Sequence, residues 1–410
     1  MKGNVIVGQS GGPTAVINSS LAGVYRTAVD RGAKKVYGML YGIQGLLDEQ
    51  YVDLSKYIRS DLDVEILKRT PSAFLGTCRY KLPDIHENQE IYVKIFEILN
   101  KLNIECFIYI GGNDSMDTIK KLSDYAILTG QSQKFVGVPK TIDNDLALTD
   151  HTPGYGSAAK YIATSTKEVI RDGIGFSYKK QQVIIIEIMG RNAGWLTGAA
   201  ALSRGEDCDG PDLIYLPELT FDIEKFTAKV RKLLVKKDVV VVAVSEGIRI
   251  QDGRYVSELG SASDYVDAFG HKQLTGTASY LANVIHRDIG CKTRAVEFST
   301  LQRSAAHLAS RVDVNEAFMV GGAAVKAADE GDSGKMVVID RVSDDPYMSA
   351  AGIYDVHKIA NNEKTVPRSW VNKDGSYVTQ EFVNYVEPLI QGDYQPFMVN
   401  GLPQHLVLKR

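Results

Sequence analysis

Short runs of apolar residues recur along the chain, and each run ends in a glycine-rich or polar loop that leads into a helical pattern. The runs are nearly continuous, which is typical of strands buried on both faces of a sheet. They predict strands at residues 5–7, 35–40, 106–110, 135–138, 183–188, 213–216, 239–244 and 336–339. Strands that alternate with helices in this way predict an α/β fold of doubly wound, Rossmann-like parallel sheets.

The chain has 410 residues, which is long for one hydrophobic core, because cores stop growing at roughly 250–300 residues. We therefore expect two lobes of this α/β type. We assign residues 1–150 and about 300–340 to the first lobe, and residues 151–299 to the second. From about Arg341 the chain is richer in tyrosine, asparagine and aspartate and less periodic, so we assign 341–410 to the second lobe as an extension.

The overall charge and the cysteines exclude several classes of partner and location. A net charge of −3 provides no field that would hold nucleic acid or an anionic membrane, so neither is expected as a partner. The 4 cysteines show no metal-binding spacing, and such sparse use suits the reducing cytosol. No apolar run approaches the roughly 18 residues of a membrane span. We expect a cytoplasmic protein that gathers a bound anion with local groups.

The loop after the first predicted strand offers a cradle for an anion. It reads Ser10-Gly11-Gly12-Pro13-Thr14 and leads into a helix from about Val16. Two glycines let the backbone approach a ligand closely, and the helix N-terminus supplies free amides with a partial positive charge. On its own, a glycine pair after a strand more often indicates a tight turn.

The loop after residues 106–110 adds oxygen ligands to the same pattern. Gly111-Gly112-Asn113-Asp114-Ser115 precedes a predicted helix. Its candidate metal ligands are Asn113 and Asp114, because Mg²⁺ is usually held by one or two carboxylates together with substrate phosphates. An Asp-Ser helix cap is the alternative, and on this loop alone the cap is the better explanation.

The loop after residues 135–138 carries the most reactive groups. Pro139-Lys140-Thr141-Ile142-Asp143-Asn144-Asp145 places two carboxylates, an amide, a hydroxyl and a lysine within seven residues. A turn would explain Asp-Asn-Asp, but not the lysine and threonine just upstream. One carboxylate can accept a proton from a hydroxyl while the other binds metal or orients the acceptor. With the two preceding loops, this segment predicts phosphoryl transfer.

Later loops supply groups for an anionic sugar. Met189-Gly190-Arg191 ends one predicted strand, and Ser245-Glu246 ends another. Arg294 and Arg303 lie nine residues apart, and guanidinium forks suit a phosphate monoester. Each arginine by itself is most simply a surface residue, whereas together they fit one sugar phosphate.

These motifs, in this order, resemble the phosphofructokinases. The resemblance spans roughly the first 340 residues and rests on Ser10–Gly12, Leu75–Tyr80, Gly111–Ser115, Lys140–Asp145, Met189–Arg191, Ser245–Glu246 and Thr293–Arg303. It implies a donor-binding first lobe and a sugar-phosphate-binding second lobe, with the active site between them. It also implies Mg²⁺ as the cofactor, fructose 6-phosphate as the acceptor, and a homodimer or other homo-oligomer.

The resemblance further implies a role for each matching residue. Asp143 would take the proton from the 1-hydroxyl of fructose 6-phosphate, Asp145 would support the metal and orient the acceptor, and Thr141 would contact the sugar phosphate. The donor would be held by Gly11, Gly12, Gly112 and Arg79. The sugar and its 6-phosphate would be held by Met189, Gly190, Arg191, Glu246, Arg294 and Arg303.

Two positions bear on the identity of the donor. ATP-using members of this family carry glycine at the positions of Asp114 and Lys140, whereas diphosphate-using members resemble this chain at both. A carboxylate beside the α-phosphate of ATP would cost on the order of 4 kcal/mol at an effective dielectric constant of about 20. Lys140 would add positive charge where the departing phosphate becomes more negative. Both residues indicate reversible transfer from inorganic diphosphate, in glycolysis and gluconeogenesis.

The chain departs from the family pattern at three further positions. Asn113 stands where an acidic metal ligand is usual, and Gln182 replaces an arginine that many members lend across the subunit boundary. Thr300 takes the place of a common histidine or tyrosine near the sugar phosphate. Two alternatives to the diphosphate enzyme stay open: an ATP-dependent phosphofructokinase, and a non-catalytic regulatory subunit that binds a sugar phosphate. The donor glycines and the Asp143 carboxylate argue against the regulatory subunit.

Overall fold

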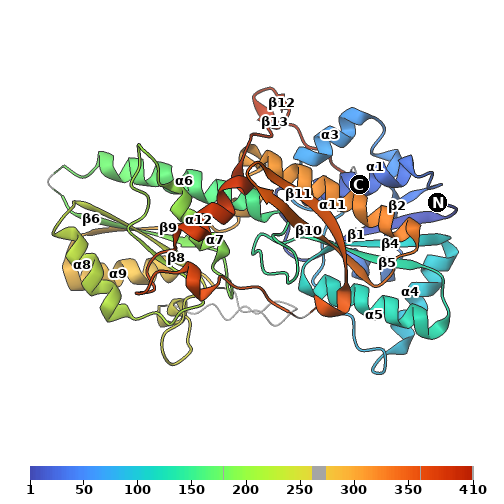
Figure 1. The fold of residues 1–410 in the computed structure, drawn as a ribbon, viewed down its shortest axis with the longest axis horizontal. Helices are drawn as coiled ribbons and strands as arrows, with labels where there is room; N and C mark the ends of the chain where they lie inside the picture. The colour runs from blue at the N-terminus through green and yellow to red at the C-terminus, as the bar shows by residue number, and fades with distance from the viewer. Residues whose placement is uncertain (179, 261–273, 361, 409–410) are drawn as a thin grey trace. The chain divides into compact units, whose positions relative to one another are not determined.

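The computed structural model describes residues 1–178, 180–260, 274–360 and 362–408. The contacts within this α/β protein divide it into two compact units (Figure 1). The first unit comprises Met1–Ser157, Arg303–Glu363 and Gln391–Arg410, and the second comprises Ala158–Gln302 and Lys364–Ile390. Each unit is built around its own sheet.

The first unit contains a seven-stranded sheet with strand order β11-β10-β5-β4-β1-β2-β3. Its parallel strands are β1 (Asn4–Gln9), β2 (Val36–Met39), β4 (Ile104–Gly111), β5 (Lys134–Pro139) and β10 (Lys335–Asp344). Antiparallel strands β3 (Tyr51–Asp53) and β11 (Tyr347–Asp355) form its edges. Because β1, β4 and β5 are neighbours, the loops that follow them begin side by side.

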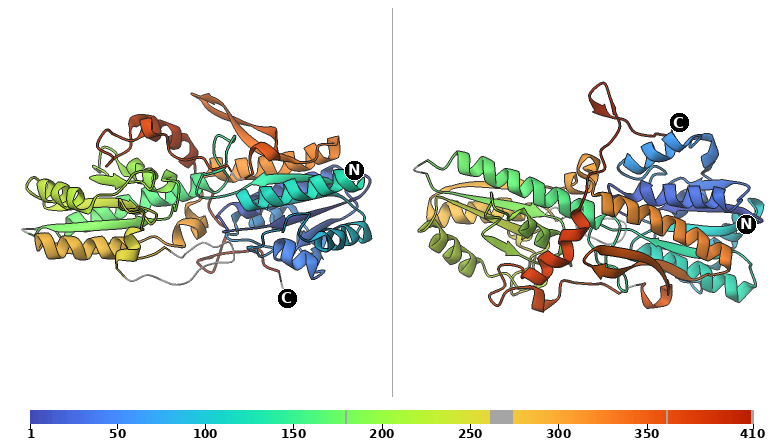
Figure 2. Two further views of the ribbon diagram at one scale, coloured as in Figure 1. Left: turned by 90° about the horizontal axis from the view of Figure 1, so that it is seen from below. Right: turned by 45° about the horizontal axis from the view of Figure 1, so that its top comes forward.

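Helices cover both faces of this sheet (Figure 2). Helices α1 (Ile17–Asp30) and α11 (Arg311–Glu330) lie on one face, and α4 (Gln89–Lys101) and α5 (Asn113–Thr129) lie on the other. The central strands β1, β4 and β5 are almost entirely buried between them, so both faces of these strands must be apolar. That requirement explains the continuous apolar runs of the sequence.

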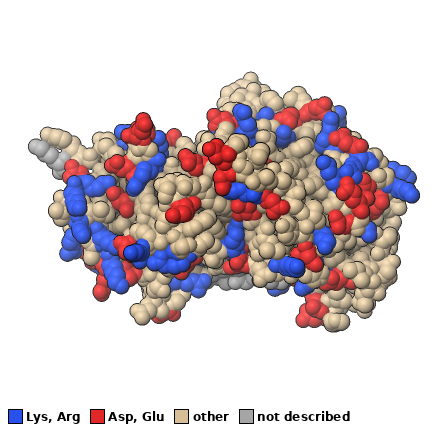
Figure 3. All heavy atoms as spheres, viewed as in Figure 1, with Lys and Arg blue, Asp and Glu red and all other residues tan. Residues whose placement is uncertain are grey.

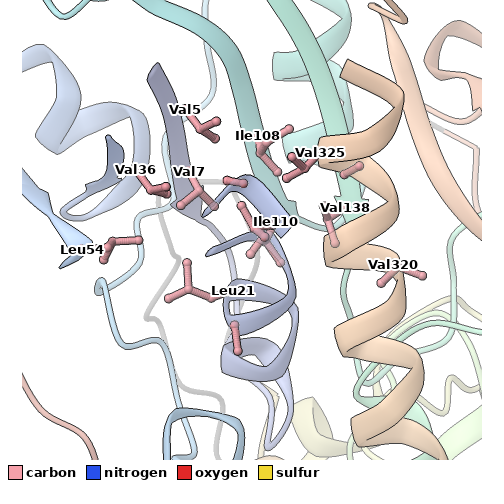
Figure 4. Packing of buried hydrophobic residues seen from close by; sticks show 14 of the residues in the cluster. Val5, Val7, Leu21, Val36, Leu54, Ile108, Ile110, Val138, Val320 and Val325 are labelled. Carbon is pink, nitrogen blue, oxygen red and sulfur yellow. The ribbon is translucent and has the colours of Figure 1, made fainter. Parts of the chain in front are cut away.

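Helices α1 and α11 pack closely against each other over a core that includes β1. Leu21 of α1, Val320 of α11 and Val7 of β1 belong to one cluster of buried hydrophobic residues (Figure 4). The two helices approach so closely that a Cβ atom on Gly23 would lie 2.1 Å from the carbonyl oxygen of Phe318. Only glycine permits this backbone contact.

The second unit contains a four-stranded parallel sheet with strand order β7-β8-β6-β9. Its strands are β6 (Gln182–Ile188), β7 (Leu213–Tyr215), β8 (Val239–Ser245) and β9 (Lys292–Glu297). Its longer helices are α6 (Tyr155–Gly175), α8 (Ile223–Leu234) and α9 (Thr277–Ile289). The other α-helices and strands of the described residues are α2 (Gly42–Leu47), α3 (Asp61–Arg69), α7 (Trp195–Gly198), α10 (Leu301–Ser304), α12 (Gln380–Val386), β12 (Met398–Val399) and β13 (Leu402–Pro403).

The predicted α/β fold with parallel sheets is confirmed, and all eight predicted strands are present. The assignment of the tail is wrong for most of its length. Strand β11 pairs with β10 in the first sheet, and residues 341–363 and 391–410 belong to the first unit. Only 364–390 belongs to the second unit. The edge strands β3, β9 and β11 escaped prediction because half-exposed edge strands lack a continuous apolar run.

The surface agrees with the small net charge of the sequence. Acidic and basic side chains are interspersed over the face that Figure 3 shows. Within the described ranges, no helix combines the length and apolar character needed to cross a bilayer.

Candidate active site

The three predicted loops of the first unit meet at one edge of its sheet. The amide of Ser10, after β1, donates to the carbonyl of Ile110 on β4 at 3.0 Å. The amide of Lys140, after β5, donates to the carbonyl of Gly111 at 3.1 Å. The predicted convergence of these loops is therefore present, and it follows from the adjacency of three parallel strands.

Lys140 is a buried cation at the carboxyl ends of these strands. Its side chain is 3% exposed, and its Nζ donates to the carbonyl oxygen of Gly12 at 2.8 Å. Gly11 has a φ of 76°, and a Cβ atom there would lie 3.1 Å from the same Nζ. The glycine loop and Lys140 thus pack directly against each other, and the glycines leave room for the amine.

The surroundings of Lys140 shift its pKa in opposite directions. Burial lowers the pKa of Lys140 to about 8, while the carboxylates of Asp143 and Asp145 act to raise it. Arg79 and Arg303 lower it further because like charges repel. A phosphate arriving among these three cations would relieve their repulsion, as expected of a donor site.

The two carboxylates predicted to be catalytic, Asp143 and Asp145, differ in their surroundings. The Asp143 amide donates to Thr141 Oγ1 at 3.1 Å, and that hydroxyl lies 3.4 Å from Asp143 Oδ2. Burial, followed by the charges of Asp143 and Glu363, raises the pKa of Asp145 to about 7. Glu363 was not predicted, because it lies far along the chain with no local motif. A carboxyl group whose pKa is raised to this range can hold a proton near neutral pH.

The raised pKa of Asp145 has a consequence for stability. The folded state disfavours the charged carboxylate, so stability falls as the pH rises from about 4 through about 7. Asp145→Asn stays neutral and is expected to unfold at higher denaturant concentration than the wild type at pH 8. One pKa unit corresponds to about 1.4 kcal/mol, and we expect a gain on the order of 2 kcal/mol because Asp145 is partly exposed. Urea unfolding at pH 4 and pH 8 measures this gain; an equal difference at both pH values would contradict it.

The loop between β4 and α5 does not contain the helix cap considered above. Gly112 occupies the capping position of α5 without any side-chain cap bond. Asn113 Oδ1 is buried and accepts no hydrogen bond from the residues that the structure describes. Asp114 follows in the first turn of the helix. An unpartnered amide oxygen beside a carboxylate fits a Mg²⁺ ligand set completed by donor phosphates.

Arg303 reaches the glycine loop, and the segment that carries Arg79 is bound to the same loop. The segment before Arg79 is bound to that loop, since the Gly11 amide donates to the Cys78 carbonyl at 3.2 Å. A Cβ atom on Gly12 would lie 3.2 Å from Nη1 of Arg303. Arg303, which the sequence grouped with the sugar 6-phosphate, therefore lies beside a donor glycine in the first unit.

In the second unit, the predicted sugar-binding residues share one edge of the sheet. Gly190, with a φ of 133°, follows β6, and Glu246 follows the neighbouring β8. Ser245 Oγ donates to the Gly190 carbonyl at 2.6 Å, and the Gly190 amide donates to Glu246 Oε1 at 3.5 Å. Met189 and Arg191 flank Gly190, so all four predicted residues lie together.

Arg294 and Gln182 lie apart from that group. Arg294 is paired in register with Ile184, in the middle of β6, and its Nη1 donates to Asp172 Oδ2 at 2.9 Å. Gln182 is 3% exposed and donates to the carbonyl of Gly173 on α6. The side chain of Gln182 therefore makes this contact within the second unit. The role of Arg294 at the sugar phosphate stays a prediction.

Comparisons with known proteins agree with this arrangement. A model of the phosphofructokinase family matches residues 4–328. The pyrophosphate–fructose 6-phosphate 1-phosphotransferase of Xanthomonas campestris pv. campestris is 43% identical over 408 residues, covering 99% of this chain and 96% of that one. The enzyme of the same name from Halomonas elongata is 41% identical over 403 residues, covering 98% and 95%. The solved pyrophosphate-dependent phosphofructokinase of Nitrosospira multiformis matches with a TM-score of 0.89 and 36% identity, covering 99% and 96%.

Proposed function

The chain belongs to the phosphofructokinase family, and we propose that it transfers a phosphoryl group reversibly between inorganic diphosphate and the 1-hydroxyl of fructose 6-phosphate. The products are fructose 1,6-bisphosphate and orthophosphate. The names of its relatives from Xanthomonas and Halomonas support this reaction over the ATP-dependent alternative. Lys140 is the main structural support, because it places a buried cation on the glycine loop next to the Asp143 and Asp145 carboxylates.

The bonding changes follow from the residues of the first unit. Asp143 accepts the proton of the sugar 1-hydroxyl while that oxygen bonds to the terminal phosphorus of diphosphate. The bond from that phosphorus to the bridging oxygen breaks, and its electron pair leaves with orthophosphate. Lys140 and Arg79 stabilise the charge that builds up on the departing phosphate. In reverse, the Asp143 carboxyl returns the proton to the sugar oxygen.

The sugar is assigned to the second unit. Met189, Gly190 and Arg191 supply backbone and guanidinium groups, and Glu246 accepts hydrogen bonds from sugar hydroxyls. Glu246 already contacts the Gly190 amide, which supports a shared role. A hydroxyl bound by a buried acceptor is discriminated strongly from analogues that lack it, because the acceptor is then left unpaired.

We propose Mg²⁺ as the cofactor, held by Asn113 and Asp114 together with diphosphate oxygens. When bound, it would neutralise donor charge and align the terminal phosphoryl group. The buried, unpartnered Oδ1 of Asn113 supports this assignment. An amide adds no charge, so most of the charge on the ligand set comes from Asp114 and the donor.

A comparison of donors tests the proposed function. Purified protein with fructose 6-phosphate and Mg²⁺ is expected to form fructose 1,6-bisphosphate from diphosphate, with a much lower kcat/KM for ATP. Chelation of Mg²⁺ is expected to abolish turnover, and its return to restore it. A higher kcat/KM with ATP would establish the ATP-dependent enzyme instead, and no turnover in either direction would favour the regulatory subunit.

We also propose a homo-oligomer, most simply a homodimer, located in the cytoplasm. Exposed Phe176 and Tyr178, 59% and 82% exposed, follow α6 and offer apolar surface that a second copy could cover. All four cysteines are free thiols, which suits a reducing compartment. Light scattering on the purified protein checks the subunit number, and cell fractionation checks the location.

A further inference from the structure

The loop that carries Lys140, Asp143 and Asp145 folds back on itself before α6 begins. Thr141 and Gly154 form a parallel bridge, and Thr152 Oγ1 donates to the Thr141 carbonyl at 2.7 Å. Asn144, between the two aspartates, is buried and has a left-handed φ of 55°. Its Oδ1 accepts from the Thr152 amide at 3.1 Å. Residues 151–154 therefore brace the turn that presents the catalytic carboxylates.

His151 sits at the start of this brace and is held between two carboxylates. Its side chain is 1% exposed. Nδ1 lies 2.8 Å from Asp150 Oδ1, and Nε2 lies 2.6 Å from Glu316 Oε2. Glu316, which is 5% exposed, belongs to α11, which lies on the same face of the first sheet as α1. The contact joins residues 165 positions apart, so no local sequence pattern indicates it.

Charged and polar groups from two further strands join the cluster. Arg341 of β10 donates to Asp150 Oδ1 through Nε at 3.1 Å and Nη2 at 3.0 Å. Tyr347 and Ser349 of β11 each donate a hydroxyl to Glu316 Oε1 at 2.6 Å. The chain of charges alternates in sign from Arg341 to Glu316. Such a network is costly to break, because removal of one partner leaves a buried charge uncompensated.

We propose that His151 is a positioning residue for phosphoryl transfer, whose charged contact with Glu316 holds residues 151–154 where they brace the turn of Asp143 and Asp145. The proposal rests on the proposed function, since it assigns catalysis to that turn. In this role His151 acts through Thr152, the residue that follows it and that bonds to the turn. Loss of the contact with Glu316 frees the brace and displaces Asp143 from the acceptor hydroxyl.

The protonation states of the cluster agree with this role. Although burial opposes it, Glu316 and Asp150 raise the pKa of His151 to about 9. His151 and its other partners keep the pKa of Glu316 below its usual value. The nearby Asp313 of α11, which accepts from the Gly154 and Ser157 amides, has a pKa raised by burial. The imidazolium contact thus persists up to about pH 9 and weakens above it, and it is lost at acid pH when Glu316 is protonated.

Glu316→Gln is the decisive variant, because it removes one charge and keeps size and hydrogen-bonding capacity. Without that carboxylate, burial lowers the pKa of His151, so the imidazole is neutral at pH 8. We expect kcat to fall about tenfold at pH 8, since a misplacement of about 1 Å can cost up to roughly 10²-fold. The deficit should shrink as the pH rises above about 9, where His151 of the wild type also loses its proton and with it the charged contact. KM for diphosphate should change less than kcat.

The chain offers a matched control in His357, which lies between Asp124 and Asp355 at 2.9 and 2.8 Å but is surface-exposed. Asp355→Asn should leave kcat and its pH profile unchanged. A wild-type pH profile and normal kcat in folded Glu316→Gln would overturn the proposal, as would a kcat deficit that is independent of pH. An inactive wild type would instead reject the proposed function.

A second variant covers the case in which Glu316→Gln does not fold. Tyr347→Phe removes only the hydroxyl that donates to Glu316. The Glu316 carboxylate then loses a donor, so its pKa rises. We expect the acid limb of the kcat profile to move to higher pH while the alkaline limb stays in place. An unmoved acid limb would overturn the proposal.

Discussion

An Asp143→Asn enzyme is expected to bind its substrates with little change while its kcat falls by roughly 10²–10⁴-fold, the usual contribution of a positioned general base. The amide is almost the same size as the carboxylate but does not accept the proton of the sugar 1-hydroxyl. The forward and reverse reactions should lose the same factor at equilibrium substrate ratios, because both pass through one transition state. Steady-state kinetics in both directions measures the loss.

The control for Asp143→Asn must show that the variant is folded like the wild type. Its unfolding transition in urea should resemble that of the wild type at pH 8, and the KM for diphosphate should stay within a few-fold. Because Asp143 acts to raise the pKa of its neighbours, a somewhat lower pKa of Asp145 is also expected. Undiminished kcat in a folded variant would remove Asp143 from the role of base.

Replacement of Asp114 by glycine is expected to exchange donors. A carboxylate close to the α-phosphate of ATP costs on the order of 4 kcal/mol at an effective dielectric constant of about 20. Since about 1.4 kcal/mol is a factor of ten, its removal can raise the kcat/KM for ATP by up to roughly three orders of magnitude. The kcat/KM for diphosphate should fall, because Asp114 also contributes to the proposed Mg²⁺ site. Parallel assays with the two donors measure the exchange.

Asp114→Asn separates charge from volume in this experiment. Asparagine removes the charge at almost constant size, so a gain of ATP use in both variants identifies repulsion as the cause. A gain in the glycine variant alone identifies steric exclusion. If neither variant uses ATP better than the wild type, Asp114 does not select the donor.

The sequence predicted the chemistry of the first unit because that chemistry follows from one rule of parallel sheets. Lys140 and Asp143 were placed together with Gly12 from their positions after strands, and the structure brings these residues to one edge of the sheet. The sugar-binding loops at Gly190 and Glu246 follow the same rule in the second unit. Each of these residues lies within a few positions of a strand end, so a local pattern sufficed.

Contacts between segments that lie far apart in the sequence leave no local pattern from which they could be predicted. Glu363 influences Asp145, and Glu316 pairs with His151, although each lies more than 150 residues away along the chain. The tail was misplaced for the same reason, because the pairing of β11 with β10 depends on the sheet and not on local periodicity. Arg303 was grouped with Arg294 by spacing, whereas the fold places it beside Gly12.

The hydrogen bond from Lys140 to the Gly12 carbonyl affects when the entropy of this side chain is lost. A mobile lysine gives up about 2 kcal/mol of rotamer freedom when it is immobilised. Here the amine is immobilised during folding, before any donor arrives. Diphosphate therefore meets a rigid ammonium group whose hydration shell is already gone, and its affinity does not include that entropy loss. Because a buried charge is poorly screened by mobile ions, this contribution to donor affinity is insensitive to the salt concentration around the enzyme.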